Sequence, residues 1–198
     1  MSWTRTTVIR AGAGAILTAT AISAGVYIAG AEDHTPSAAE AETIKAAVND
    51  ALNTSYANAV TPGDTEKLAA LTTEQLDHKY ADVEKHLRAV YTGPPLDREL
   101  EGMATVREAE SEGDGFRVVG GGARALDWTS VTIDGDTAHA AGRDEAWLDT
   151  AQPDEEGQYT AAHAYTQHSF VIDLKKNPDG SWITTEMTLK KDVPGYLP

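Results

Sequence analysis

The sequence contains no cysteine among its 198 residues. The chain therefore cannot form disulfides, thiolate metal sites, cysteine nucleophiles or lipid attachments to cysteine. It is also short of basic side chains, because 16 Lys and Arg stand against 31 Asp and Glu, for a formal net charge of −15. Nucleic-acid affinity depends on Lys and Arg that displace counterions from phosphates, so we expect no nucleic acid among its partners. Anionic lipid head groups would also repel so acidic a surface.

What the chain does contain is enough apolar material for one folded domain. Hydrophobic residues make up 41% of the sequence and include four Trp, which is too much for a disordered chain. We place the domain at residues 41–193, after a polar tether at residues 32–40. A domain of this size buries roughly 70% of its unfolded surface, so it needs no disulfide to be stable.

Residues 1–31 have the layout of an export signal. A short basic segment with Arg5 and Arg10 precedes an uncharged run over residues 11–31, and Ala29-Gly30-Ala31 fits the A-x-A cleavage pattern. The alternative is an uncleaved membrane anchor, because about 20 apolar residues can span a hydrocarbon core of ~30 Å. Either way the remainder is exported, and we expect it to be secreted or anchored on the outer side of the cytoplasmic membrane. We expect a membrane contact only through this segment, if it is not cleaved.

The first half of the domain has helical periodicity. Apolar residues recur every three to four positions from residue 41, which predicts an amphipathic helix with a stripe of Ile44, Val48, Leu52, Tyr56 and Ala59. A turn at residues 61–64 ends this helix, and a short helix follows around residues 65–71.

A second long helix begins at residue 72. Thr72 and Gln75 have capping-box spacing, and the apolar side of the helix consists of Leu76, Tyr80, Val83, Leu87 and Val90. Gly93-Pro94-Pro95 ends it. Residues 96–112 stay open between helix and loop, because Gly102 interrupts a moderate helical pattern.

The second half of the domain predicts antiparallel strands. An extended run begins at residue 116, with a bulge or bend expected at Gly120–Gly122. Asp134-Gly135 forms a hairpin turn to a return strand over residues 137–148, and a polar loop at residues 152–157 follows. From residue 162 a long strand places alternate side chains on one face, at Ala164, Thr166, His168, Phe170, Ile172 and Leu174.

A tight turn at Asn177-Pro178-Asp179-Gly180 leads into the last strand. That strand, over residues 182–190, has one face made of Ile183, Thr185, Met187 and Leu189. Helices first and antiparallel hairpins afterwards indicate an α+β domain.

This order of elements resembles the NTF2-like superfamily of SnoaL-like and ketosteroid-isomerase-like domains. The resemblance lies in the stripe from Ile44 to Tyr56, the strand over residues 162–174, the turn at 177–180 and Ser181-Trp182-Ile183. It covers most of residues 40–190 and is similar to exported actinobacterial members. It implies N-terminal helices packed on a curved antiparallel sheet that forms a cone. The mouth of the cone binds small molecules in the enzymes, whereas non-enzymatic members serve as binding or assembly modules.

Five side chains are candidates for a ligand pocket, namely Tyr56, Tyr80, Trp147, His168 and Phe170. An imidazole such as His168 exchanges protons near neutral pH. Chemistry of the ketosteroid-isomerase type also needs a carboxylate base and acidic donors. No spacing selects among the available carboxylates, so no catalytic residue is assigned, and the candidates are Asp144, Glu145, Asp173 and Glu186. We expect no cofactor and no metal, because the acidic clusters at 134–136 and 154–156 lack the ligand spacing of a calcium loop.

Two functions follow from these patterns. The first is an exported, non-catalytic binding or assembly module at the cell envelope, whose partner is an envelope protein or a small apolar ligand. The alternative is a pocket enzyme that carries out acid–base chemistry, such as an isomerase, dehydratase or cyclase. The first is favoured by the export signal and by the lack of a convergent acid–base set in the sequence, and it predicts a filled or narrow apolar cone.

Overall fold

The computed structural model describes residues 35–57, 60, 71–111, 116–153 and 159–195. The expected leader at 1–31, the turn at 61–64 and nearly all of the short helix at 65–71 lie outside the described residues. Among the helices of the described part, none is long and apolar enough to span a membrane.

In the described part of the chain three helices precede the strands, α2 (Ala38–Ala57), α3 (Thr73–Val90) and α4 (Pro94–Ser111). The expected stripe of α2 is buried at Ile44, Val48, Leu52 and Tyr56, while Ala59 lies outside the described residues. The helix begins at Ala38, inside the segment expected to be a polar tether, because Ser37 and Glu40 cap its first turn. The Glu40 amide donates to Ser37 Oγ, and Glu40 Oε2 accepts from the Ser37 amide.

The start of α3 confirms the expected capping box. The Gln75 amide donates to Thr72 Oγ1, and Gln75 Oε1 accepts from the Thr72 amide at 2.9 Å. All five residues expected on its apolar side are buried.

The segment left open at residues 96–112 is helical. Gly93 has φ of 64°, a left-handed conformation that redirects the chain after α3. Pro94 then occupies the first position of α4, where a missing amide proton costs nothing because that group has no partner within the helix. Gly93-Pro94-Pro95 therefore ends one helix and begins the next.

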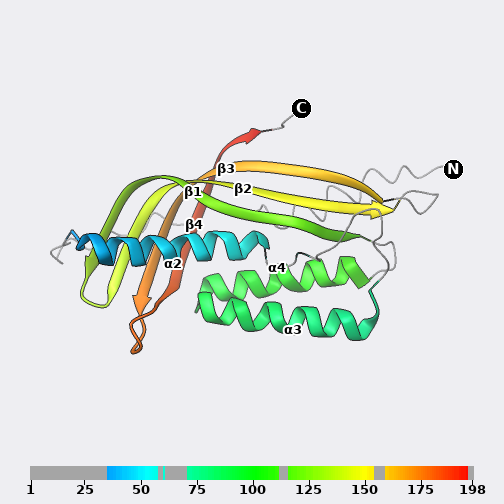
Figure 1. The fold of residues 1–198 in the computed structure, drawn as a ribbon, viewed down its shortest axis with the longest axis horizontal. Helices are drawn as coiled ribbons and strands as arrows, with labels where there is room; N and C mark the ends of the chain where they lie inside the picture. Colours follow the sequence, from blue (N-terminus) through cyan, green and yellow to red (C-terminus); the bar gives the residue numbers. More distant parts are fainter. Residues whose placement is uncertain (1–34, 58–59, 61–70, 112–115, 154–158, 196–198) are drawn as a thin grey trace.

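The four strands form one antiparallel sheet in the order β1-β2-β3-β4. Their bounds are β1 (Arg117–Asp134), β2 (Thr137–Pro153), β3 (Tyr159–Lys176) and β4 (Trp182–Gly195). Figure 1 shows that the sheet is strongly bent and that the three helices lie on its concave side. The α+β prediction is therefore confirmed, with N-terminal helices on a curved antiparallel sheet.

The alternation expected for β3 is also confirmed. Phe170, Ile172 and Leu174 are buried on the side that faces the helices. Across from them, β2 presents small residues at Gly142, Ala140 and Ala138. The bulky side chains of β3 and of the helices fill the space that these small residues leave.

The prediction that Ile183, Thr185, Met187 and Leu189 share one face of β4 is wrong. Leu174 pairs with Thr184 and Asp173 with Glu186, so Thr185 is an extra residue in a β-bulge. The bulge shifts the alternation, and the buried residues are Trp182 and Thr184 before it and Met187 after it.

Helix α2 covers the edge of the sheet along β1. Asn49 and Asn53, one helical turn apart, accept hydrogen bonds from the amides of Ala125 at 3.0 Å and Ala123 at 3.3 Å. Gly121 allows this approach, because a Cβ atom at that position would collide with the Tyr56 carbonyl oxygen. The two asparagines thus satisfy strand groups that would otherwise be open to pairing with another chain.

Candidate functional site

A cavity of about 110 Å³ lies between the helices and the concave side of the sheet. Its wall is mainly apolar, and α3, α4 and three strands supply Val83, Leu87, Met103, Val106, Val118, Leu148 and Leu189. Three polar side chains join them, Ser55 and Tyr56 from the last turn of α2 and Glu99 from α4. A pocket with apolar walls and a few convergent polar groups is the usual form of a small-molecule site.

Gly102 also lines the cavity, from the middle of α4. A Cβ atom at this position would meet no atom within 4 Å, apart from its chain neighbours and its own helix backbone. Packing therefore does not require glycine here, in contrast to Gly121. Since glycine weakens a helix interior, its effect at residue 102 is to leave open space beside the cavity.

The polar end of the cavity is a chain of hydrogen bonds. Ser55 Oγ lies 3.0 Å from Glu99 Oε1 and 2.8 Å from the hydroxyl of Tyr91. The Tyr91 hydroxyl in turn donates to the carbonyl of Ala51. These contacts join α4 and the residue that follows α3 to the last turns of α2.

This hydrogen-bond chain has three contacts, and each contact needs one proton. The hydroxyls of Tyr91 and Ser55 supply one each. If Glu99 is ionised, Ser55 donates to it, and no proton is left between Ser55 and Tyr91. A protonated Glu99 completes the chain, because Glu99 then donates to Ser55 and Ser55 donates to Tyr91.

The electrostatics of the cavity favour the uncharged form of the Glu99 carboxyl. Burial raises the pKa of Glu99, and the hydrogen bond with Ser55 and the charge of Arg98 lower it by less. Burial also raises the pKa of Tyr56, and the charges of Asp144 and Glu99 add to this effect. Both groups at the cavity wall are therefore stabilised in their uncharged forms.

Behind Tyr56 lies a buried pair of titratable residues. The Tyr56 ring stacks on His168 with centroids 6.4 Å apart, and His168 Nδ1 lies 3.3 Å from Asp144 Oδ2. Both side chains are almost fully buried, and neither lines the cavity. Asp144 Oδ1 has no hydrogen-bond partner among the residues that the structure describes. Asp144 is the exception among the inward residues of β2, which are otherwise small from residue 138 to residue 146.

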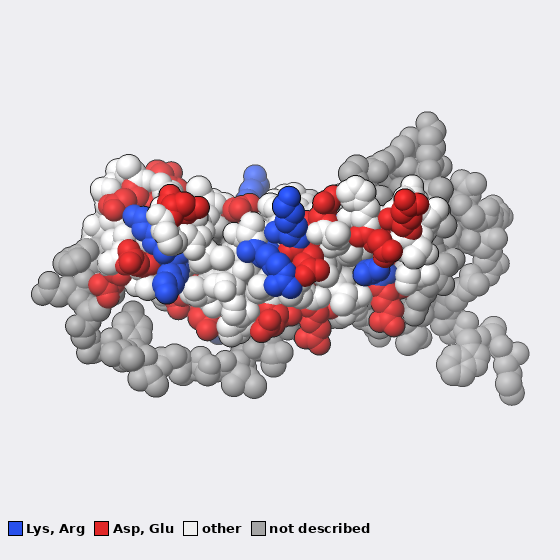
Figure 2. Space-filling model, turned by 90° about the horizontal axis from the view of Figure 1, so that it is seen from below, with Lys and Arg blue, Asp and Glu red and all other residues white. Residues whose placement is uncertain are grey.

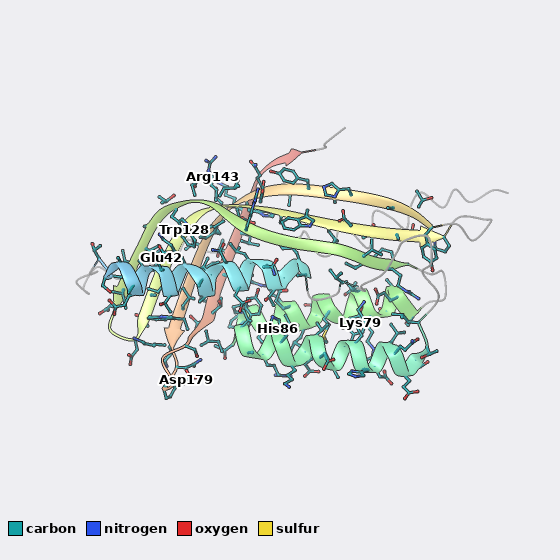
Figure 3. All side chains as sticks on the ribbon, viewed as in Figure 1. Glu42, Lys79, His86, Trp128, Arg143 and Asp179 are labelled. Carbon is teal, nitrogen blue, oxygen red and sulfur yellow. The ribbon has the colours of Figure 1, made fainter. Side chains whose placement is uncertain are left out.

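The structure separates the five sequence candidates. Tyr56 lines the cavity and contacts His168, while Phe170 lies one inward position further along β3 and packs against Trp128 with ring centroids 5.5 Å apart. In Figure 3, Trp128 lies on the α2 side of the sheet.

Tyr80 and Trp147 lie away from the cavity. The Tyr80 hydroxyl donates to Glu110, which also accepts hydrogen bonds from Lys79. Trp147 is half-buried on the outer face of the sheet, beside Tyr165 on β3. Figure 3 shows Arg143 on this same outer side.

Glu99 and Ser55 are site residues that the sequence analysis missed. Glu99 fell in the segment left open between helix and loop. The spacing of Glu99, Met103 and Val106 is that of one helix face, so assigning a helix would have placed Glu99 among apolar residues.

A second hollow, of about 420 Å³, is a more open groove beside α2 and α3. It is lined by Thr54, Lys79, Asp82 and His86, among others, and His86 Nε2 lies 3.2 Å from Thr54 Oγ1. Figure 3 shows both His86 and Lys79 in the region of α3 and α4. Within the described ranges, no group of three or more His, Asp or Glu side chains is arranged to hold a metal ion.

Solved structures with a similar course of the chain include the intermembrane space region of the chloroplast protein ARC6. It is 18% identical with a TM-score of 0.35, over 64% of this chain and 99% of that chain. An NTF2-like protein involved in plasmid conjugation is 7% identical with a TM-score of 0.32, over 81% of this chain and 51% of that chain. No protein-family model and no curated protein matches the sequence. At these levels of similarity, function has to be inferred from the residues of the site.

Proposed function

We propose that this chain is an exported, non-catalytic binding module of the NTF2-like type, which holds a small, largely apolar ligand at the cell envelope. The observation that carries the proposal is the cavity of about 110 Å³, whose described lining is mainly apolar and includes one carboxyl group, Glu99. The order of elements, with helices on the concave side of a curved sheet, supports the NTF2-like assignment.

The size of the cavity limits the ligand. If each water-sized group takes about 30 Å³, a volume of about 110 Å³ holds roughly four such groups. An engineered apolar cavity of about 150 Å³ holds benzene, so this cavity suits a short alkyl chain rather than a polycyclic molecule.

A binding role also fits the position of the acid–base groups. His168 and Asp144 form the pair best suited to proton transfer, but they are buried and outside the cavity. A general base has to lie within hydrogen-bond reach of the proton that it removes. A ligand in the cavity would be separated from His168 by the Tyr56 ring.

An acid–base enzyme is the second candidate, favoured by one observation. Glu99 and Tyr56 both lie at the cavity wall with raised pKa values, and a neutral carboxyl can donate a hydrogen bond to a developing oxyanion. Turnover of a small carbonyl compound that Glu99→Gln abolishes, with ligand affinity unchanged, would establish this second function.

The export part of the proposal is supported by the sequence of residues 1–31, which has a basic start, an apolar run and an A-x-A pattern. Expression in a bacterial host, followed by N-terminal sequencing of protein from the medium and from the envelope, tests it. A new N-terminus at Glu32 establishes cleavage, and an intact N-terminus in the envelope establishes an anchor. Recovery of intact protein from the cytoplasm alone contradicts export.

Binding is tested by NMR titration of the purified protein with two neutral probes, xenon and 1-butanol. We expect saturable shifts confined to residues of the cavity. Gly102→Leu places a side chain in the open space and should weaken both probes by tenfold or more. Gly102→Ala adds one methyl group and is the matched control. If neither probe binds the unmodified protein, the proposal is wrong.

A further inference from the structure

Among the described residues no cation forms an ion pair with the Glu99 carboxyl, although it lines an apolar cavity. None of the ion pairs in the described part of the chain includes Glu99. Its basic neighbour Arg98 is directed to β4, where its Nη2 donates to the Met187 carbonyl at 2.7 Å. In the part of the chain that the structure describes, the hydrogen-bond partner of this carboxyl is Ser55, through Oε1.

We propose that the cavity binds a short primary alkylammonium ion, with Glu99 as its counterion and the alkyl chain against the apolar walls. This inference rests on the proposed function and specifies its ligand class. A chain of about three to five carbons matches a volume of about 110 Å³. Glu99 Oε2 accepts one of the three ammonium donors, while Oε1 keeps its contact with Ser55.

The surroundings favour a cation over other small ligands. The chain carries a formal net charge of −15, and Figure 2 shows acidic side chains spread over the helical face with fewer basic ones among them. A field of this sign attracts cations and repels carboxylates. A neutral alcohol fits the same space, but it brings no positive charge that would stabilise the ionised form of Glu99.

The ammonium ion and the proton compete for Glu99. On α4, Arg98 is the charged neighbour. From α2, Ser55 and the uncharged Tyr56 face the carboxyl, and Tyr91 follows in the hydrogen-bond chain. The cavity-lining residues of α3 and the strands are apolar. An alkylammonium ion keeps its proton up to a pH of about 10, so Glu99 is the group among the described cavity residues whose titration competes with amine binding.

The test measures n-butylammonium, 1-butanol and butyrate against the full chain, as purified after any processing, by NMR titration at low salt. We expect n-butylammonium to bind at least tenfold more tightly than 1-butanol, and butyrate to bind not at all. Glu99→Gln should remove this preference and leave 1-butanol binding intact. Glu101→Gln removes the same charge from an exposed position on α4 and should change neither affinity.

The outcomes separate the two proposals. Two results would show that the ligand class is wrong while the binding module stands. In the first, 1-butanol binds and n-butylammonium does not. In the second, Glu99→Gln binds both the amine and the alcohol with the affinities of the unmodified protein. If no probe binds, both are wrong. The pH series gives an independent readout. Amine affinity should fall as the pH is lowered through the titration of Glu99, whereas the weak amine affinity of Glu99→Gln should stay flat.

Discussion

The hydroxyl of Tyr80 on α3 donates a hydrogen bond of 2.8 Å to the fully buried carboxylate of Glu110 on α4. The same carboxylate accepts from Lys79 and from the amide of Val118 at the start of β1. In Figure 3 the Lys79 label lies between α3 and α4. Glu110 thus joins two helices and the sheet through three donors, away from the cavity.

This junction predicts a graded loss of stability. Glu110→Gln removes the charge of the carboxylate that pairs with Lys79 at 2.7 Å, and removing one partner of a buried ion pair typically costs 3–5 kcal/mol. Because the Lys79 side chain keeps 14% exposure, we expect the lower end, about 3 kcal/mol. Tyr80→Phe removes one hydrogen bond and should cost about 1 kcal/mol. Urea denaturation measures both, with Lys85→Ala on the exposed side of α3 as control. Equal effects of the two variants would contradict the network.

Gly102→Ala should stabilise the protein by about 0.5–1 kcal/mol, because alanine is the better residue in a helix interior and its methyl group meets open space. Gly121→Ala is the opposite case, since its methyl group would collide with the backbone of α2. Thermal denaturation of the two variants should therefore give shifts of opposite sign. A destabilised Gly102→Ala would mean that α4 packs more closely there than the structure indicates.

Glu99 should make the stability of the unliganded protein fall as pH rises. Its pKa is raised in the folded state above the usual value of 4.5, chiefly by burial. Its contribution is therefore fully present below that value and is lost as the pH rises through the folded-state pKa. The free energy of unfolding of Glu99→Gln, relative to the unmodified protein, should increase over this window. Urea denaturation from pH 4 to pH 8 measures the difference, and a difference independent of pH would contradict the raised pKa.

Asn53→Ala should open one position on the edge of β1. The Ala123 amide loses its acceptor, which typically costs about 1 kcal/mol, and its hydrogen exchange should become faster. Asn49→Ala is the matched comparison, because it should expose the Ala125 amide instead. If exchange at Ala123 is the same in Asn53→Ala as in the unmodified protein, the helix does not protect this edge as described.

Much of the fold follows from local sequence patterns. The buried stripe of α2, the capping box of α3 and the alternation along β3 are all readable, because each is fixed by residues close together in the chain. The bulge at Thr185 is not, since it depends on how β4 pairs with β3. The sequence does not decide between helix and loop for α4, because Gly102 weakens the helical pattern although Pro94 allows a helix start.

The site was less accessible to prediction than the fold. Tyr56 was identified, but Glu99 and Ser55 come together only because α4 packs across the end of α2. Asp144 and His168 were noted separately, and the strand register that sets them opposite each other cannot be derived from alternation alone. Sequence periodicity predicts which face a residue occupies, whereas neighbours across elements depend on tertiary packing.

The position of α2 along the edge of β1 has a consequence for how the chain acquires its shape. Synthesis runs from the N-terminus, so α2 is made before α3 and α4, and its partner strand is made after both. Until then the apolar face of α2 has no strand to pack against, and a nascent chain with such a face exposed is prone to aggregate. Contacts between segments this far apart in the sequence also form slowly compared with a single helix. Folding of this protein should therefore depend on the synthesis of its C-terminal half.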